Sequence, residues 1–197
     1  MSGVQVLNEP QPIELGHGKV ELEVFLEPTC PFSKRAFFKL QPLLSAVGEK
    51  NVTIKIRFLS QPWHLFSGVV TRCILAATAT AGGREAGLTV MSAVYDHRED
   101  FESDDHCTGP HMELSPAQIV TRMSDLSGID LSEAFKLKSV DQALRWHTRY
   151  CRQNGVHTSP SFAINGLVND AISSGQSIEE WSQLLGFGAP ARLAASS

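Results

Sequence analysis

The sequence lacks closely spaced cysteines. Its four cysteines lie far apart along the chain, at Cys30, Cys73, Cys107 and Cys151. No two of them form a Cys-x-x-Cys pair, and none is spaced with histidines as a closed zinc site requires. His106, Cys107 and His111 share an acidic loop but match no such pattern. We therefore expect separate thiols in a reducing compartment and no metal.

Long apolar runs and clusters of basic residues are also missing. The most apolar stretch, residues 73–81, is too short to cross a bilayer, and no basic segment followed by an apolar core begins the chain. We therefore expect a cytoplasmic protein without a membrane partner. A formal net charge of -4, with no basic cluster, argues against nucleic acid as a partner.

The composition is that of a soluble globular protein. The chain has 197 residues, 42% of them hydrophobic and 19% charged, which is enough for one domain of ordinary size with a sizeable core. The sequence does not distinguish a monomer from a homodimer.

The first patterned segment alternates strand and helix. Apolar residues alternate over 20–26, which predicts a half-buried strand, and recur at helical spacing over 31–47. Gly48 ends that helix, and Pro42 predicts a kink or break near Gln41. A second strand is expected over 52–59. This strand–helix–strand order predicts a parallel pair of strands.

The middle of the chain contains no strand candidate. Helices are expected over five ranges: 67–81, 84–95, 115–126, 131–135 and 140–154. Ser115 is a good N-cap for the third of them. This pattern predicts an all-helical insertion between two halves of an α/β domain.

Strand signals return near the C-terminus. Residues 161–166 predict a short strand ending in an Asn-Gly turn, with a hairpin partner at 167–168 continued by 170–172. A capping box at 177–180 opens a last helix through Leu185. We divide the chain into an N-terminal arm (1–18), a first α/β half (19–66), the insertion (67–150), a second α/β half (151–188) and a tail (189–197).

Cys30 stands where the first strand gives way to the first helix. The N–H groups and positive dipole of a helix start favour a thiolate and lower its pKa, and Pro31 suits the first helical turn. Ser33 occupies the position where a second sulfur would complete a redox pair. Its hydroxyl would either donate to the thiolate or only cap the helix.

Two motifs carry a resemblance. Cys30-Pro-Phe-Ser33 at a helix start, and Ser159-Pro160 before a short strand and Asn165-Gly166, resemble the motifs of the DsbA-like branch of the thioredoxin superfamily. The resemblance implies a thioredoxin-like α/β fold, with a mixed central sheet flanked by helices and an all-helical insertion. It implies a thiol-disulfide oxidoreductase or isomerase without a tightly bound cofactor, and a cis bond before Pro160. Substrate would then bind at Pro31, Phe32, Ser159 and Pro160.

Ser33 departs from the family's pattern, because no disulfide can form within the motif. We expect a monothiol route in which Cys30 attacks a protein disulfide or a glutathione mixed disulfide, and an external thiol, with glutathione as the candidate co-substrate, resolves the product. Two alternatives stay open. One is a kappa-class-like glutathione transferase that uses Ser33 or Thr29. The other is a redox-inactive thioredoxin-like binding module.

Glu27 and His64 lie near the ends of the two predicted strands. The resembled fold would bring both toward Cys30, where either would tune the thiol or move protons, or would merely be solvated. Trp63 with Phe32 would form an apolar wall. Cys73 and Cys151 are expected to be structural, and Cys107 exposed.

Overall fold

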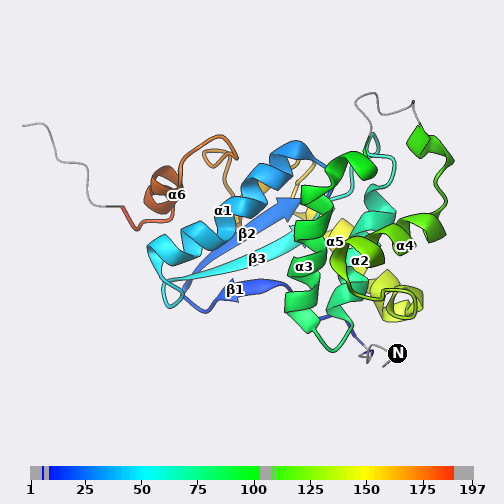
Figure 1. Ribbon diagram of the computed structural model, residues 1–197. Coiled ribbons are helices and arrows are strands. Elements are labelled where there is room, and N and C mark those ends of the chain that lie inside the picture. The colour runs from blue at the N-terminus through cyan, green and yellow to red at the C-terminus, as the bar shows by residue number, and fades with distance from the viewer. Residues whose placement is uncertain (1–5, 7–8, 103–107, 109, 189–197) are drawn as a thin grey trace, which may run out of the picture.

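A five-stranded mixed sheet forms the centre of the molecule, in the order β1-β3-β2-β4-β5 (Figure 1). The computed structural model describes residues 6, 9–102, 108 and 110–188. Strands β2 and β3 are parallel, and the other neighbours are antiparallel. The strands are β1 (Glu14–Gly16), β2 (Val20–Leu26), β3 (Val52–Phe58), β4 (Ser161–Ile164) and β5 (Leu167–Val168).

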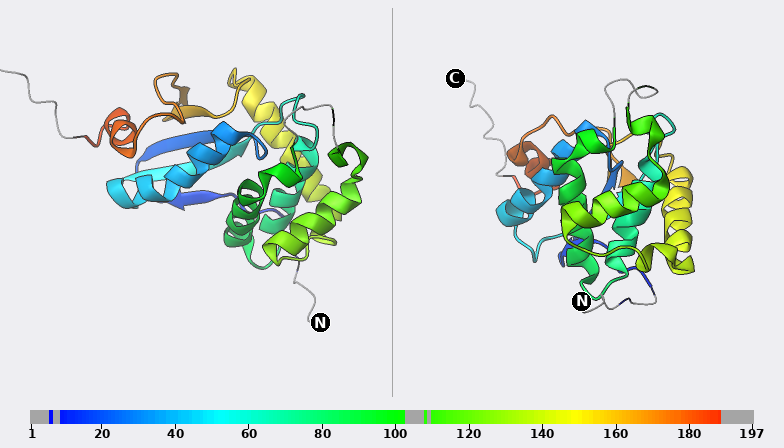
Figure 2. Two further views of the ribbon diagram at one scale, coloured as in Figure 1. Left: turned by 45° about the horizontal axis from the view of Figure 1, so that its top comes forward. Right: turned by 45° about the vertical axis from the view of Figure 1, so that its right-hand side comes forward.

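Helices cover the sheet and gather beyond one end of it (Figures 1 and 2). Helix α1 lies along the sheet with α6 beside it, while α2 to α5 form the insertion. The α-helices are α1 (Pro31–Val47), α2 (Ser67–Thr78), α3 (Gly83–Asp96), α4 (Pro116–Ser127), α5 (Lys138–Gln153) and α6 (Ile178–Leu184). Three short 3₁₀ turns are η1 (Arg98–Asp100), η2 (Pro110–Glu113) and η3 (Ala134–Lys136). This is the fold class that the sequence analysis predicted.

Strand β2 is buried on both faces, so the prediction of a half-buried strand was wrong. Leu22, Val24 and Leu26 face the main core, and Phe25 faces a second cluster that includes Cys151 of α5. Glu23 is also buried, because Arg57 Nε and the Tyr150 hydroxyl both donate to its carboxylate at 2.7 Å. Apolar residues do alternate along β2, but α5 covers the face that the alternation predicted to be exposed to solvent.

Helix α1 continues through Pro42 without interruption, so no break lies near Gln41, while the kink that the proline also predicts stays a prediction. Its buried face, which includes Ala36, Leu40 and Leu43, packs into the core. The predicted end is confirmed: Gly48 has φ of 94° and its N–H bonds to the Leu44 carbonyl at 2.8 Å. Burial of this face offsets the backbone hydrogen bond that proline cannot make.

Three predicted boundaries need correction. The arm 1–18 contains β1, which pairs antiparallel with β3. The border between residues 150 and 151 falls inside α5. Residues 170–172 do not continue the hairpin as a strand. Both expected capping interactions, at Ser115 and Ser177, are confirmed as capping boxes.

The sheet topology brings three distant segments to one edge. Strands β2 and β3 are in register, with Leu26 opposite Phe58, so both end at the same edge. Antiparallel β4 starts there, with Ser161 opposite Phe25. Cys30 after β2, the loop after β3 and the Ser159–Pro160 loop before β4 therefore converge.

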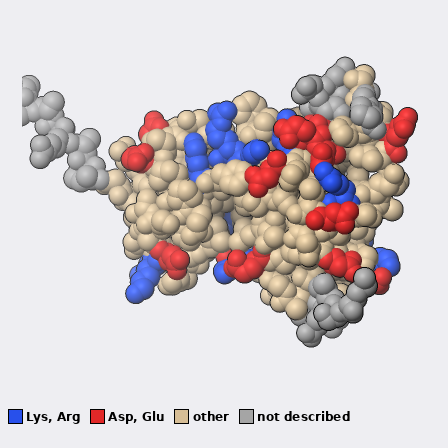
Figure 3. Space-filling model, viewed as in Figure 1, with Lys and Arg blue, Asp and Glu red and all other residues tan. Residues whose placement is uncertain are grey.

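The distribution of surface charge and the length of the helices are relevant to nucleic acid and membranes as possible partners. Lys and Arg side chains are interspersed with Asp and Glu on the face that Figure 3 shows. None of the helices in the described ranges is long and apolar enough to span a membrane. The expectation that nucleic acid is not a partner stays a prediction.

Candidate active site

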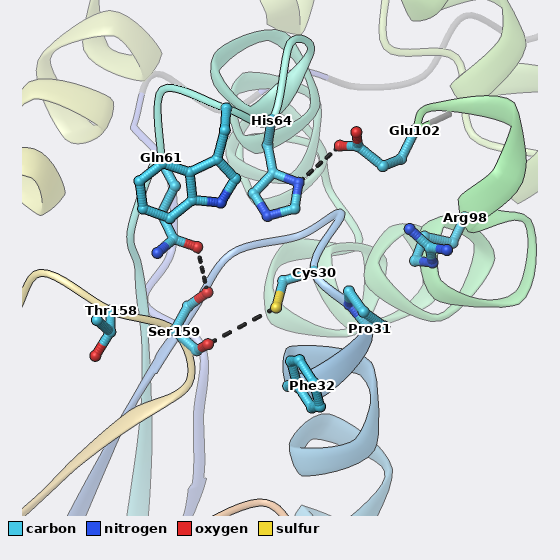
Figure 4. A pocket seen from close by; sticks show the side chains of 10 residues that line it. Cys30, Pro31, Phe32, Gln61, His64, Arg98, Glu102, Thr158 and Ser159 are labelled. Atoms are coloured by element: carbon cyan, nitrogen blue, oxygen red, sulfur yellow. Dashed lines mark hydrogen bonds and ion pairs between the residues drawn. The ribbon is translucent and has the colours of Figure 1, made fainter. Parts of the chain in front are cut away.

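A pocket of about 480 Å³ opens at the edge of the sheet where these segments meet. The β2–α1 junction, the loop after β3, the turn η1 with the segment that follows it, and the loop before β4 all contribute to it (Figure 4). Its lining residues are Cys30, Pro31, Phe32, Gln61, Trp63, His64, Arg98, Glu102, Thr158 and Ser159. A concave site with a few convergent polar groups suits a small ligand or a narrow segment of chain.

Cys30 is the N-cap residue of α1, directly before Pro31 at the first helical position. Its sulfur lies 3.7 Å from the Ser159 carbonyl oxygen. The ring of His64 lies next to Cys30 in the pocket (Figure 4). The residue is only 4% exposed, although it lines an open pocket.

His64 connects Cys30 to two buried carboxylates. Its Nδ1 lies 2.7 Å from Glu102 Oε2, and its Nε2 lies 3.7 Å from Glu27 Oε2. Burial would lower the pKa of His64. The hydrogen bond with Cys30, the charge of Glu27 and the hydrogen bond and charge of Glu102 outweigh burial and raise that pKa to about 9. The ring is therefore an imidazolium at neutral pH.

The same contacts lower the pKa of Cys30. Burial would raise this pKa, but hydrogen bonds from His64, Ser159 and the backbone N–H groups of Ser33 and Phe32 hold it below the ordinary value for cysteine. A cationic ring beside a thiol with lowered pKa favours the thiolate form of that thiol. This pair is the chemical centre of the pocket.

Glu27 lies beneath the pair and is fully buried. Its Oε2 accepts from the Thr29 backbone N–H at 2.8 Å and from the Thr29 hydroxyl at 2.9 Å. Burial raises the pKa of Glu27, although the charge of His64 and hydrogen bonds from Ser67 and Thr29 partly offset the effect. Glu27 and His64 thus both lie at Cys30, where the sequence analysis expected them.

Ser33 does not use its hydroxyl at the sulfur or as a helix cap. The Ser33 hydroxyl is buried and accepts the Glu27 backbone N–H at 3.1 Å, which ties the start of α1 to the end of β2. The group of Ser33 that reaches the sulfur is its backbone N–H. Neither Ser33 nor Thr29 lines the pocket.

The Ser159–Pro160 bond is cis, as the resemblance implied. The Ser159 hydroxyl donates to Gln61 Oε1 at 2.6 Å, which joins this loop to the loop after β3. Phe32 and Trp63 are 53% and 52% exposed and both line the pocket, and the apolar wall expected of them stays a prediction. Pro160 itself is not among the lining residues.

Four lining residues were not singled out from the sequence: Gln61, Arg98, Glu102 and Thr158. Glu102 lies in an acidic stretch that reads as a solvated loop, yet it is only 6% exposed. Arg98 and Glu102 reach Cys30 only through the packing of the insertion. No periodicity or motif in the sequence signals that contact.

Cys73 and Cys151 do not line the pocket. Cys73 is buried in α2, and burial raises its pKa to about 12. Cys151 donates to the Phe58 carbonyl at 3.3 Å, and burial raises its pKa to about 11. Cys107 and His106 lie outside the described residues. In the ranges that the structure describes, no group of three or more acidic, histidine or cysteine side chains is arranged to hold a metal.

Comparison with known proteins identifies the family. No family model and no curated protein matches the chain, but solved structures do. DsbA2 from Pseudomonas aeruginosa is 16% identical with a TM-score of 0.62, covering 89% of this chain and 95% of its own, and DsbA from Xylella fastidiosa is 15% identical with a TM-score of 0.60, covering 91% and 90%. At these identities they show the fold alone.

A candidate protein-disulfide isomerase from Pseudomonas syringae is 52% identical, with a TM-score of 0.87, covering 88% of this chain and 97% of its own. The chain belongs to the DsbA-like thiol-disulfide oxidoreductases of the thioredoxin superfamily. Members of this family are enzymes and need no tightly bound cofactor. In this DsbA-like enzyme the motif cysteine pairs with a histidine, and position 33 is a buried serine.

Proposed function

We propose that this DsbA-like protein exchanges thiols and disulfides by a monothiol route with Cys30 as the attacking sulfur. The observation that carries the proposal is that Cys30, whose pKa is lowered, lies beside the cationic ring of His64 in an open pocket. Cys30 is the one cysteine among the described residues that line this pocket. The site therefore supports one activated sulfur rather than a cycling pair.

The route needs a second thiol from outside the chain. The Cys30 thiolate attacks one sulfur of a substrate disulfide, forms a mixed disulfide, and displaces the other sulfur as a thiolate that takes a proton from His64. An external thiol such as glutathione then attacks the mixed disulfide and releases Cys30. If the displaced thiolate instead attacks another disulfide of the same substrate, and the thiolate freed there attacks the mixed disulfide, Cys30 is released and the net result is isomerisation.

Substrate backbone would bind beside the cis-proline loop. The Ser159 carbonyl faces the sulfur, and Pro31 and Phe32 form the adjoining wall. An extended segment added at this edge would align its disulfide with Cys30.

The two alternatives have weaker support. A glutathione transferase would need a hydroxyl in the pocket, but the hydroxyls of Ser33 and Thr29 are buried and engaged with Glu27. A redox-inactive binding module would have no use for a pair of opposite charges at the sulfur.

Turnover of a peptide–glutathione mixed disulfide, with glutathione as reductant, tests the proposal. Cys30→Ser should lower kcat/KM by at least about a hundredfold, because it removes the attacking thiolate. Cys73→Ala, outside the pocket, is the matched control. Ser33→Ala should cost less than about tenfold, because its backbone N–H is retained.

Retained turnover in Cys30→Ser would refute the monothiol route. Loss in Ser33→Ala, with Cys30→Ser still active, would favour the transferase. In cell lysate, wild type should form mixed-disulfide adducts that are absent from Cys30→Ser.

A further inference from the structure

Arg98 is the one lysine or arginine among the described residues that line the pocket. It belongs to η1 in the insertion, and its side chain is half-buried. In Figure 4 it lies on the opposite side of the Cys30 sulfur from Ser159. The pocket thus has a cationic end and a backbone-binding end, with the reactive sulfur between them.

The guanidinium of Arg98 keeps most of its donors available. Its Nη1 donates to the Thr29 carbonyl at 3.4 Å, which is its one hydrogen bond within the described part of the chain. A guanidinium has five N–H donors in a planar fork. The Thr29 carbonyl belongs to the peptide bond that leads into Cys30, so the cation is held one residue from the sulfur.

The two described carboxylates beside His64 are engaged elsewhere. Glu102 contacts His64 at 2.7 Å, and Glu27 is fully buried against Thr29 and His64. In the described ranges no ion pair joins Arg98 to a carboxylate. A positive charge at the edge of a small pocket selects an anionic group of the ligand.

We propose that Arg98 binds a carboxylate of a small thiol, so that the preferred substrates are mixed disulfides between a polypeptide and an anionic low-molecular-weight thiol of the glutathione kind. This inference rests on the proposed function and names its substrate class. The polypeptide part lies along Ser159 and the apolar wall of Phe32 and Trp63, while the small thiol lies toward Arg98. A pocket of about 480 Å³ has room for such a fragment.

The chemistry balances with the small thiol as reductant. The Cys30 thiolate attacks the sulfur of the bound small thiol, the polypeptide leaves as a thiolate, and a Cys30–small-thiol disulfide forms. A second small thiol attacks that sulfur, gives the symmetrical small disulfide and regenerates the Cys30 thiolate. The second small thiol gives up the proton that the polypeptide thiol gains, and its sulfur is oxidised by one electron as the polypeptide sulfur is reduced by one.

Single-turnover release of the peptide thiol isolates the first step. One peptide is prepared as its disulfide with glutathione, which carries carboxylates, and with 2-mercaptoethanol, which is neutral. Arg98→Gln should slow release from the glutathione disulfide about tenfold, the loss expected for a hydrogen bond between charged groups. Release from the neutral disulfide should change less than about twofold.

Two further variants sharpen the result. Arg98→Lys should recover part of the rate, because it restores the charge without the fork. Arg145→Gln, an exposed arginine of α5 paired with Asp141, is the matched control and should leave both rates unchanged. The rate at which iodoacetamide alkylates Cys30 reports on the thiolate itself, and should be the same in wild type and Arg98→Gln.

Equal loss with both disulfides, or a changed alkylation rate, would overturn the role of Arg98 in substrate selection. If wild type releases peptide from neither disulfide, the proposed function fails instead. Preserved discrimination in Arg98→Gln would assign carboxylate binding to another group and would also overturn the inference.

Discussion

Cys30 and His64 carry opposite charges over a shared range of pH. The range begins at the lowered pKa of Cys30 and ends near the raised pKa of His64, about 9. Within it the sulfur is already a nucleophile and the ring holds a proton for the leaving group. Outside it one member of the pair is neutral and the other loses its partner.

Removal of His64 should therefore affect the thiol most at neutral pH. Since the imidazolium favours the thiolate, His64→Ala should raise the pKa of Cys30. Alkylation by iodoacetamide near neutral pH should fall about tenfold, the effect of one pKa unit. The variant should approach wild type as pH rises toward the ordinary pKa of cysteine.

His17→Ala is the matched control, because His17 is exposed at the far end of β2. An equal loss at every pH would mean that His64 controls access to the sulfur rather than its charge.

The sequence could reveal Cys30 and Ser159–Pro160 because each has a local signature. A cysteine before a helix start, and a proline before a short strand, are visible in a few adjacent letters. Glu102 and Arg98 have no such signature. They reach the pocket because α3 and η1 pack beside the β2–α1 junction, a relation that involves residues about 70 apart in the chain.

At the scale of elements, alternation and helical spacing predicted the parallel pair β2–β3 and most of the helices. These patterns failed to predict features that depend on contacts between segments far apart in the chain. Strand β1 is three residues long and lies between prolines and glycines, so it has no period to detect. The second face of β2 is buried by α5, which lies more than a hundred residues later in the chain.

Pro42 is the element-scale test. Because α1 runs through it, Pro42→Ala should supply the missing backbone donor and improve helix propensity, raising the free energy of unfolding by about 1 kcal/mol or more. Urea denaturation measures the change.

Ser45→Ala, in the same exposed stretch of α1, is the control for side-chain propensity without a new backbone donor. An unchanged or lowered stability in Pro42→Ala would mean that contacts of the proline ring stabilise the folded state by at least as much as the missing backbone hydrogen bond costs.

At the scale of the whole molecule, the active site is shared between the thioredoxin-like core and the insertion. The core supplies Cys30, Glu27 and Ser159, and the loop after β3 supplies His64. The insertion supplies Glu102, which holds the ring of His64 at 2.7 Å, and Arg98. The insertion therefore takes part in setting the charge state of the sulfur.

Glu102→Gln tests this dependence. The amide keeps a hydrogen-bond acceptor but loses the charge, so the pKa of His64 should fall from about 9 toward 6.5, by about one unit or more. NMR titration of the imidazole measures the shift, and the alkylation rate of Cys30 near neutral pH should fall with it.

Glu99→Gln, at an exposed position of η1, should leave the titration unchanged. An unchanged His64 titration in Glu102→Gln would mean that Glu27 and Cys30 maintain the imidazolium without help from the insertion.

The depth of the sulfur sets a size limit on what can react with it. Cys30 is 4% exposed, while Phe32 and Trp63 rise beside it at more than half exposure. A disulfide buried flat in the surface of a folded domain cannot approach such a sulfur without a steric clash. A thin reagent, a small-molecule adduct or a protruding strand can, so the enzyme distinguishes targets by shape before any sulfur is exchanged.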